Sequence, residues 1–120
     1  MSNPLEEILQ ELHSQTSDII SSAIVSSDGL PVASVLADES NEDRVGGMTA
    51  AMLSLGQRAT RELFVGNLAQ TTIQGDDGLI QLIQATDDLV LVLTTVPDAK
   101  LGMILFYARQ AAKKIKALGY

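Results

Sequence analysis

The chain has 120 residues, a formal net charge of −7 and a pI of about 4.4, and it contains no cysteine. The acidic balance disfavours nucleic-acid binding, because a polyanion is approached with positive charge. The lack of thiols excludes disulfides, thiolate-bound metals and cysteine nucleophiles. The length predicts a single domain over residues 1–120, and a mean hydropathy of +0.19 favours an apolar surface that an oligomer or a partner covers.

The sequence carries no recognisable targeting or membrane-spanning signal. Its first stretch, "MSNPLEEILQELH", is acidic where a signal peptide would be basic. The longest apolar run, residues 89–96, is far shorter than the roughly 20 residues that cross a bilayer. We therefore expect a cytoplasmic protein that does not insert into membranes.

A short amphipathic helix is predicted for the segment "NPLEEILQELHSQ". Asn3 is a typical N-cap, Pro4 suits the first helical position, and Glu6 occupies the capping-box position. An apolar stripe at helical spacing follows: Leu5, Ile8, Leu9 and Leu12.

Two short β-prone runs, 19–27 and 30–37, are predicted to form a hairpin. The pair Asp28-Gly29 between them is typical of a type I′ turn, in which both central residues have positive φ. Because Pro31 has no amide hydrogen to donate, the second run is predicted to be an edge strand.

Residues 40–66 form the longest predicted helix, with Ser40 and Asp43 as a capping box and Gly66 as its end. Glycines in a helix interior cost about 1 kcal/mol each relative to alanine, so we expect another backbone to approach closely. The apolar residues have the spacing of a helix–helix seam: Val45, Met48, Met52, Leu55 and Ala59. Small residues lie beside this seam: Gly46, Gly47, Ala50, Ala51 and Ser54.

Three more strands are predicted at 67–75, 78–86 and 89–96, before a last helix that Asp98 caps and Gly119 ends. The run 89–96 is apolar on both faces, which is typical of a central strand covered on both sides. The buried side of the last helix is expected to contain Leu101, Ile104, Leu105, Ala108, Ala112 and Ile115.

The predicted order is α-β-β-α-β-β-β-α, an α+β fold in which helices sandwich one five-stranded antiparallel sheet. The first and last helices share one face, and the long helix lies alone on the other. A single helix leaves much of that face bare, so we expect a second copy of the chain to cover it.

Candidate catalytic groups are few and have simpler explanations. A nucleophilic serine at 26 or 27 needs a base, but the only histidine, His13, is expected to be solvated on the first helix. The aspartate pairs at 76–77 and 87–88 are interpreted as turn residues, and a metal site would need both turns at one end of the sheet. Phosphate-binding loops with the Walker or dinucleotide spacing are missing. We expect no metal, no cofactor and no catalytic residue.

The chain resembles the Roadblock/dynein light chain family, in particular its bacterial MglB-like members. The resemblance covers nearly the whole chain and rests on four pieces: "AIVSSDGLPVAS" (23–34), "GGMTAAMLSLGQRATRELF" (46–64), "GLIQLIQA" (78–85) and "LVLVLTT" (89–95). It implies a homodimer in which the second helices lie side by side and the third strands pair into a ten-stranded sheet.

The resemblance also implies a Ras-like small GTPase as partner, bound on the paired second helices, whose hydrolysis or location the dimer modulates in cell polarity or motility. The implied dimer interface comprises Gly47, Ala51, Ser54, Ala69, Thr71 and Ile73. The implied GTPase-binding face comprises Met48, Met52, Leu55, Arg58 and Ala59.

Two alternatives stay open at this point. A structural adaptor of a motor, cytoskeletal or polarity complex would use the same surfaces without affecting hydrolysis, and a small-ligand sensor or enzyme would need a polar pocket. Arg58 and Arg61 are candidates for an arginine finger, an effect of roughly 10³–10⁵ in rate where it occurs. A solvated helix face, with Arg58 paired to Glu62, is the simpler interpretation, because MglB-like proteins rearrange residues of the GTPase itself.

Overall fold

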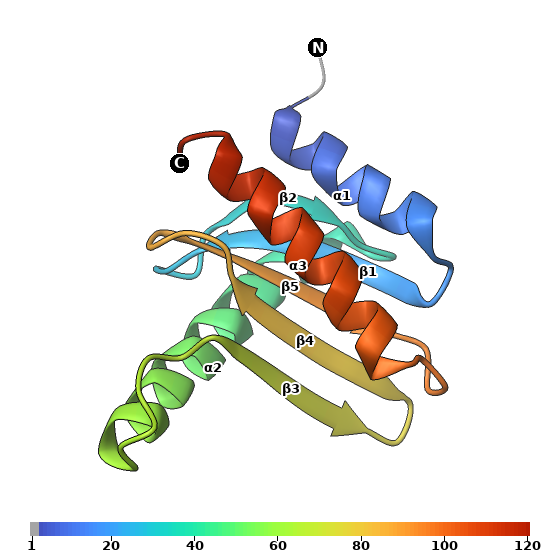
Figure 1. Ribbon diagram of the computed structural model, residues 1–120. Coiled ribbons are helices and arrows are strands. Elements are labelled where there is room, and N and C mark those ends of the chain that lie inside the picture. The colour runs from blue at the N-terminus through green and yellow to red at the C-terminus, as the bar shows by residue number, and fades with distance from the viewer. Residues whose placement is uncertain (1–2) are drawn as a thin grey trace.

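The computed structural model describes residues 3–120 and has three layers, with one antiparallel sheet between helices (Figure 1). The expected order α-β-β-α-β-β-β-α is confirmed, with one short 3₁₀ turn added. The elements are α1 (Pro4–Gln15), β1 (Ile19–Ser26), β2 (Pro31–Val35), the 3₁₀ turn η1 (Glu39–Asn41), α2 (Glu42–Glu62), β3 (Gln70–Gly75), β4 (Gly78–Gln84), β5 (Leu89–Thr95) and α3 (Leu101–Ala117).

The strands lie in the order β2-β1-β5-β4-β3, so β5 is central and β2 and β3 are the edges. Both predictions drawn from strand composition are confirmed. The run that is apolar on both faces forms β5, which pairs with β1 and β4, and Pro31 begins the edge strand β2.

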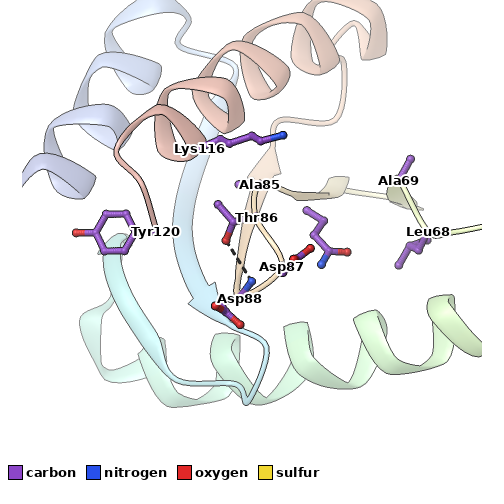
Figure 2. A pocket seen from close by; sticks show the side chains of 9 residues that line it. Leu68, Ala69, Ala85, Thr86, Asp87, Asp88, Lys116 and Tyr120 are labelled. Carbon is purple, nitrogen blue, oxygen red and sulfur yellow. Dashed lines mark hydrogen bonds between the residues drawn. The ribbon is translucent and has the colours of Figure 1, made fainter.

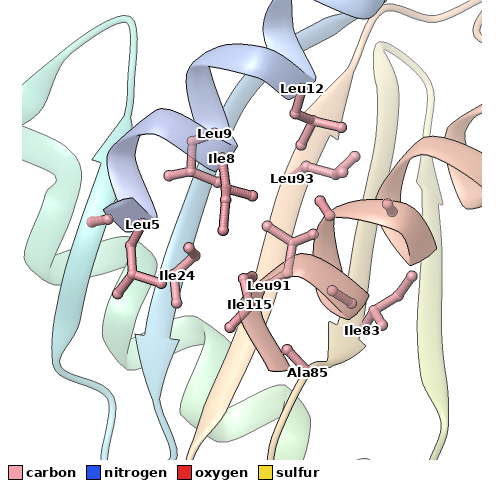
Figure 3. Packing of buried hydrophobic residues seen from close by; sticks show 14 of the residues in the cluster. Leu5, Ile8, Leu9, Leu12, Ile24, Ile83, Ala85, Leu91, Leu93 and Ile115 are labelled. Atoms are coloured by element: carbon pink, nitrogen blue, oxygen red, sulfur yellow. The ribbon is translucent and has the colours of Figure 1, made fainter. Parts of the chain in front are cut away.

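The larger core lies between the sheet and the pair α1 and α3, which share one face (Figures 1 and 3). Asn3 caps α1 as predicted, since its Oδ1 accepts a hydrogen bond from the amide of Leu5 at 2.9 Å. The predicted apolar stripe of α1 is buried in full: Leu5, Ile8, Leu9 and Leu12. It packs with side chains from α3 and the sheet, including Ile24, Ile83, Leu91, Leu93, Ile104 and Ile115.

The start of α3 differs from the prediction. Asp98 does not cap it, because the helix begins only at Leu101, after a turn in which the Ala99 amide donates to the carbonyl of Val96. Leu101 is consequently exposed, and Ala111 takes a buried place that the sequence pattern did not assign. Gly119 ends the helix as predicted, with a φ of 87°.

The β1–β2 turn also differs from the predicted type I′ geometry. Within residues 3–120, Phe64 is the only non-glycine with positive φ, so Asp28 has negative φ and Gly29 alone is left-handed, at 86°. The amide of Gly29 donates to the Ser26 carbonyl, and that of Ser26 donates to the Leu30 carbonyl. This is a three-residue hairpin loop closed by a bulge, a common alternative to the two-residue turn.

Helix α2 is shorter than the predicted 40–66 at both ends. Asp38, and not Ser40, caps the preceding 3₁₀ turn, and its carboxylate accepts hydrogen bonds from the amide and hydroxyl of Ser40. At the other end the helix stops at Glu62, and the predicted terminator Gly66 lies beyond it with a φ of 96°.

Close contact at Gly46 places the first half of α2. A side-chain carbon at Gly46 would overlap the carbonyl oxygen of Gly29 and would lie 3.1 Å from Pro31 Cδ. The predicted approach of another backbone therefore exists, but the other backbone is the chain's own β1–β2 turn. Farther along, Leu53 packs on Leu82 and Val90 of the sheet.

We predict that Gly46→Ala destabilises the fold by about 1–3 kcal/mol, because the helix must move away from the turn. Gly102→Ala is the matched control, since a side chain at this helical glycine meets nothing within 4 Å. It should be neutral or stabilising by up to about 1 kcal/mol. Urea denaturation followed by circular dichroism measures both, and equal stabilities of the two variants would contradict this role of Gly46.

Candidate interaction surface on the α2 face

His13 is half-buried and not solvated, contrary to expectation. Its Nε2 lies 2.8 Å from Oγ of Ser22 on β1, because this flank of α1 packs against the sheet. Ser22 is 1% exposed, so its hydroxyl is not accessible to a substrate. Ser26, one of the two serines considered as nucleophiles, uses its hydroxyl to accept a hydrogen bond from the Leu30 amide within the hairpin loop.

A pocket of about 540 Å³ lies at the end of the sheet between the β4–β5 turn and the last residues of the chain (Figure 2). Its polar groups belong to the turn: Thr86 Oγ1 accepts hydrogen bonds from the amides of Asp88 and Leu89. Lys116 and Tyr120 line the opposite side. Asp87 and Asp88 also line it, and they belong to the same turn.

The two aspartate pairs occupy opposite ends of the sheet. Residues 76–77 join β3 to β4, whereas 87–88 join β4 to β5 at the other end of β4. Among residues 3–120 no group of three or more His, Cys, Asp or Glu side chains is placed to hold a metal ion.

The α2 face, by contrast, has an open apolar groove of about 200 Å³ between α2 and the sheet. We call it the α2 groove, and its lining residues are Arg44, Val45, Met48, Thr49, Met52, Ile80, Val92 and Thr94. The hydroxyl of Thr49 is buried without a hydrogen-bond partner. Arg44 supplies the only charge along the lining.

The predicted seam of α2 follows the flank that faces this groove. At 100° per residue, its members lie within one narrow sector, next to the buried sector of Gly46, Thr49 and Leu53. Val45 and Met52 are half-buried against the sheet, while Met48 and Leu55 are 58% and 69% exposed and Ala59 is exposed too. An apolar stripe this exposed is typical of a surface that a partner covers.

The small residues occupy a different sector, the outer face of α2. Gly47, Ala51 and Ser54 are exposed there, and a side chain at Gly47 would meet nothing within 4 Å. Arg58 lies on the same face and pairs with Glu62 at 3.4 Å. Arg61 instead turns towards the sheet end, where it lines a cleft of about 310 Å³ with Asp87.

Strand β3 is an unprotected sheet edge. It contains no proline and no charged residue, its pairing with β4 has no bulge, and Ile73 on the α2 face is 41% exposed. Such edges readily pair with another strand. The other edge, β2, is guarded by Pro31 and by an irregular register beside it.

Residues 5–95 match the Roadblock/LC7 domain family. The chain belongs to this family. A relative, the uncharacterized protein MJ1340 of Methanocaldococcus jannaschii, is 36% identical over 116 residues, which cover 95% of this chain and 98% of the relative.

Solved Roadblock structures share the fold of this chain. A Roadblock/LC7 domain from Streptomyces avermitilis superposes with a TM-score of 0.88 at 18% identity, over 94% of this chain and 95% of that one. An MglB in a tetrameric arrangement superposes with a TM-score of 0.86 at 19% identity, over 98% and 91%. This Roadblock domain and MglB thus share one fold. Across residues 3–120, no helix is both long and apolar enough to cross a bilayer.

Of the residues assigned to interfaces from sequence, the structure gathers Met48 and Met52 at the α2 groove and leaves Thr71 and Ile73 on the open edge strand. Ala69 lies just before β3 and is exposed. Sequence reasoning missed Ile80, on the groove floor, and the exposed residues 63–65, which it had placed inside the helix. The apolar run before Gly66 is the signal that points to this segment.

Stability should depend on the protonation of His13. Burial lowers the pKa of His13 from its ordinary value of 6.5, so just below that pH the unfolded chain binds more protons than the folded one. Neutral His13 therefore makes its full contribution to the free energy of unfolding above about pH 6.5. This contribution is lost as the pH falls through the lowered pKa of the folded chain. Urea denaturation at pH 7.5 and 5.5 should show a larger decrease for the wild type than for His13→Gln. Equal decreases would contradict this assignment.

Proposed function

We propose that this Roadblock domain forms a homodimer through β3 and α2. The observation that carries the proposal is the combination of an unprotected edge strand and an incompletely covered sheet face, both on the same side of the molecule. Antiparallel pairing of two β3 strands would satisfy the free edge and give a ten-stranded sheet. The tetrameric arrangement of an MglB supports oligomerisation in structures of this kind.

The α2 groove and the outer face of α2 then have different roles. In a dimer paired through β3, the partner approaches α2 from the side of the groove, which buries the stripe of Met48, Met52, Leu55 and Ala59. The outer face, with Gly47, Ala51, Ser54 and Arg58, remains accessible. We therefore propose the reverse of the assignment that the resemblance implies. The methionine stripe belongs to the dimer interface, and the small residues belong to the GTPase-binding face.

The second part of the proposal is that the outer faces of the paired α2 helices bind a Ras-like small GTPase in the cytoplasm. Small side chains let the backbone of a partner approach closely, and the helix pair offers a rigid platform. Binding would modulate hydrolysis by selecting one conformation of the GTPase. The shared fold with MglB supports this proposal, because the resemblance to MglB-like proteins implies regulation of a Ras-like GTPase.

The adaptor role is the second candidate, because the same platform could hold a partner without changing its chemistry. Stoichiometric complex formation with unchanged GTP hydrolysis would identify an adaptor. Accelerated single-turnover hydrolysis would identify an activator.

Ile73→Lys should convert the dimer into a monomer, because it places a charge on the strand edge that pairs. Val32→Lys is the matched control: both side chains are 41% exposed, but Val32 belongs to the opposite edge strand β2. Sedimentation equilibrium at micromolar concentration should give a monomer for the first variant and a dimer for the second. Two dimers would contradict the assignment of β3.

If the partner GTPase supplies its own catalytic groups, Arg58→Ala and Arg61→Ala should each reduce stimulated hydrolysis by less than about tenfold. Single-turnover GTP hydrolysis with excess Roadblock dimer measures this. A loss of about 10³-fold or more for either variant would instead identify an arginine finger.

A further inference from the structure

The end of α2 exposes three consecutive apolar side chains. Leu63, Phe64 and Val65, which we call the 63–65 tip, are 73%, 93% and 72% exposed. Figure 1 shows the last turns of α2 projecting away from the sheet. This tip is a concentrated apolar surface at an extremity of the domain.

The tip is held in a defined shape and is not a frayed end. The Val65 amide donates to the Thr60 carbonyl at 2.9 Å, and the Phe64 amide donates to the Arg61 carbonyl at 3.2 Å. These two bonds form a Schellman motif, whose left-handed position is normally glycine. Here it is Phe64, with a φ of 60°. A bulky residue in this conformation is a strained choice for the fold alone.

The length of α2 determines where the tip would lie in a β3-paired dimer. Arg61 still lines a cleft beside Asp87, and the helix reaches the β3 edge at Gly56, where a side chain would contact Leu68 and Thr71. From there to the tip the helix runs on for about 10 Å, at 1.5 Å per residue. This distance spans about two strand spacings of 4.8 Å. The tip would therefore pass over the partner's β3 and β4, where Ile73 is exposed and Ile80 is half-buried on the α2 face.

The α2 groove fits this occupant in character as well as in place. Arg44 is the one charged residue of its lining, and the three side chains of the tip are all apolar. A buried phenylalanine supplies roughly 150–250 Å² of contact, against about 800 Å² per partner in a stable interface. Because a two-fold axis repeats the contact, each dimer would contain two such insertions.

We infer that the 63–65 tip of each protomer inserts into the α2 groove of a second copy of this chain, with Phe64 as its anchor. The inference rests on the proposed dimer and assigns it a specific contact. The insertion also explains why a bulky residue occupies the left-handed position. The Phe64 side chain would stabilise the dimer interface, although its backbone conformation lowers the stability of the monomer.

Phe64→Gly separates the two effects of this residue. Glycine suits the left-handed position, so in the monomeric Ile73→Lys background the variant should raise Tm, by about 4 °C. In the otherwise wild-type chain the same substitution should raise the dimer Kd at least tenfold by sedimentation equilibrium. A dimer Kd that changes less than twofold would overturn the inference. If that dimer also lost GTPase binding, the tip would belong to the GTPase-binding surface instead.

Because the chain contains no cysteine, site-specific crosslinking gives a second test. Val65→Cys combined with Ile80→Cys should give covalent dimers with a short bismaleimide, whereas Val65→Cys combined with Val32→Cys and each single-cysteine variant should not. A wild-type dimer in which the first pair does not crosslink would overturn the tip insertion and leave the dimer standing. A monomeric wild-type chain would overturn both.

Discussion

The contact between Gly46 of α2 and the β1–β2 turn at Gly29 determines where the long helix crosses the sheet. Because the helix axis is fixed at this close approach, α2 covers only one end of its sheet face and continues past the β3 edge. The open α2 groove and the projecting tip are both consequences of that placement. The sheet is therefore well covered on the α1 and α3 face, where one large core forms, and only partly covered on the α2 face.

The residues exposed on the α2 face are more typical of an interaction surface than of an active site. His13, considered as a base, lies beside buried Ser22, and the hydroxyl of Ser26, considered as a nucleophile, accepts a hydrogen bond from the Leu30 amide within the hairpin loop. What remains accessible on that side is the methionine stripe, the mainly small residues of the outer face of α2, and the β3 edge, which is rich in threonine and glutamine.

Local patterns were enough to predict most of the fold from sequence. The stripe of α1, the edge position of Pro31 and the central place of β5 each follow from a short-range rule, and each is confirmed. The predictions that differ depend on tertiary contacts, such as the start of α3 and the partner of Gly46. The surroundings of the α2 faces could not be predicted because apolar and small residues occupy several sectors of one helix. Only the position of the helix over the sheet shows which sector borders the groove and which faces outward.

Hydrogen–deuterium exchange across β3 tests the central claim, that a second copy completes this domain, most directly. The account predicts slow exchange at micromolar concentration for the β3 amides that point away from β4, and faster exchange on dilution below the dimer Kd. The outward amides of β2 should exchange rapidly at every concentration. Rapid, concentration-independent exchange along both edges would contradict the account.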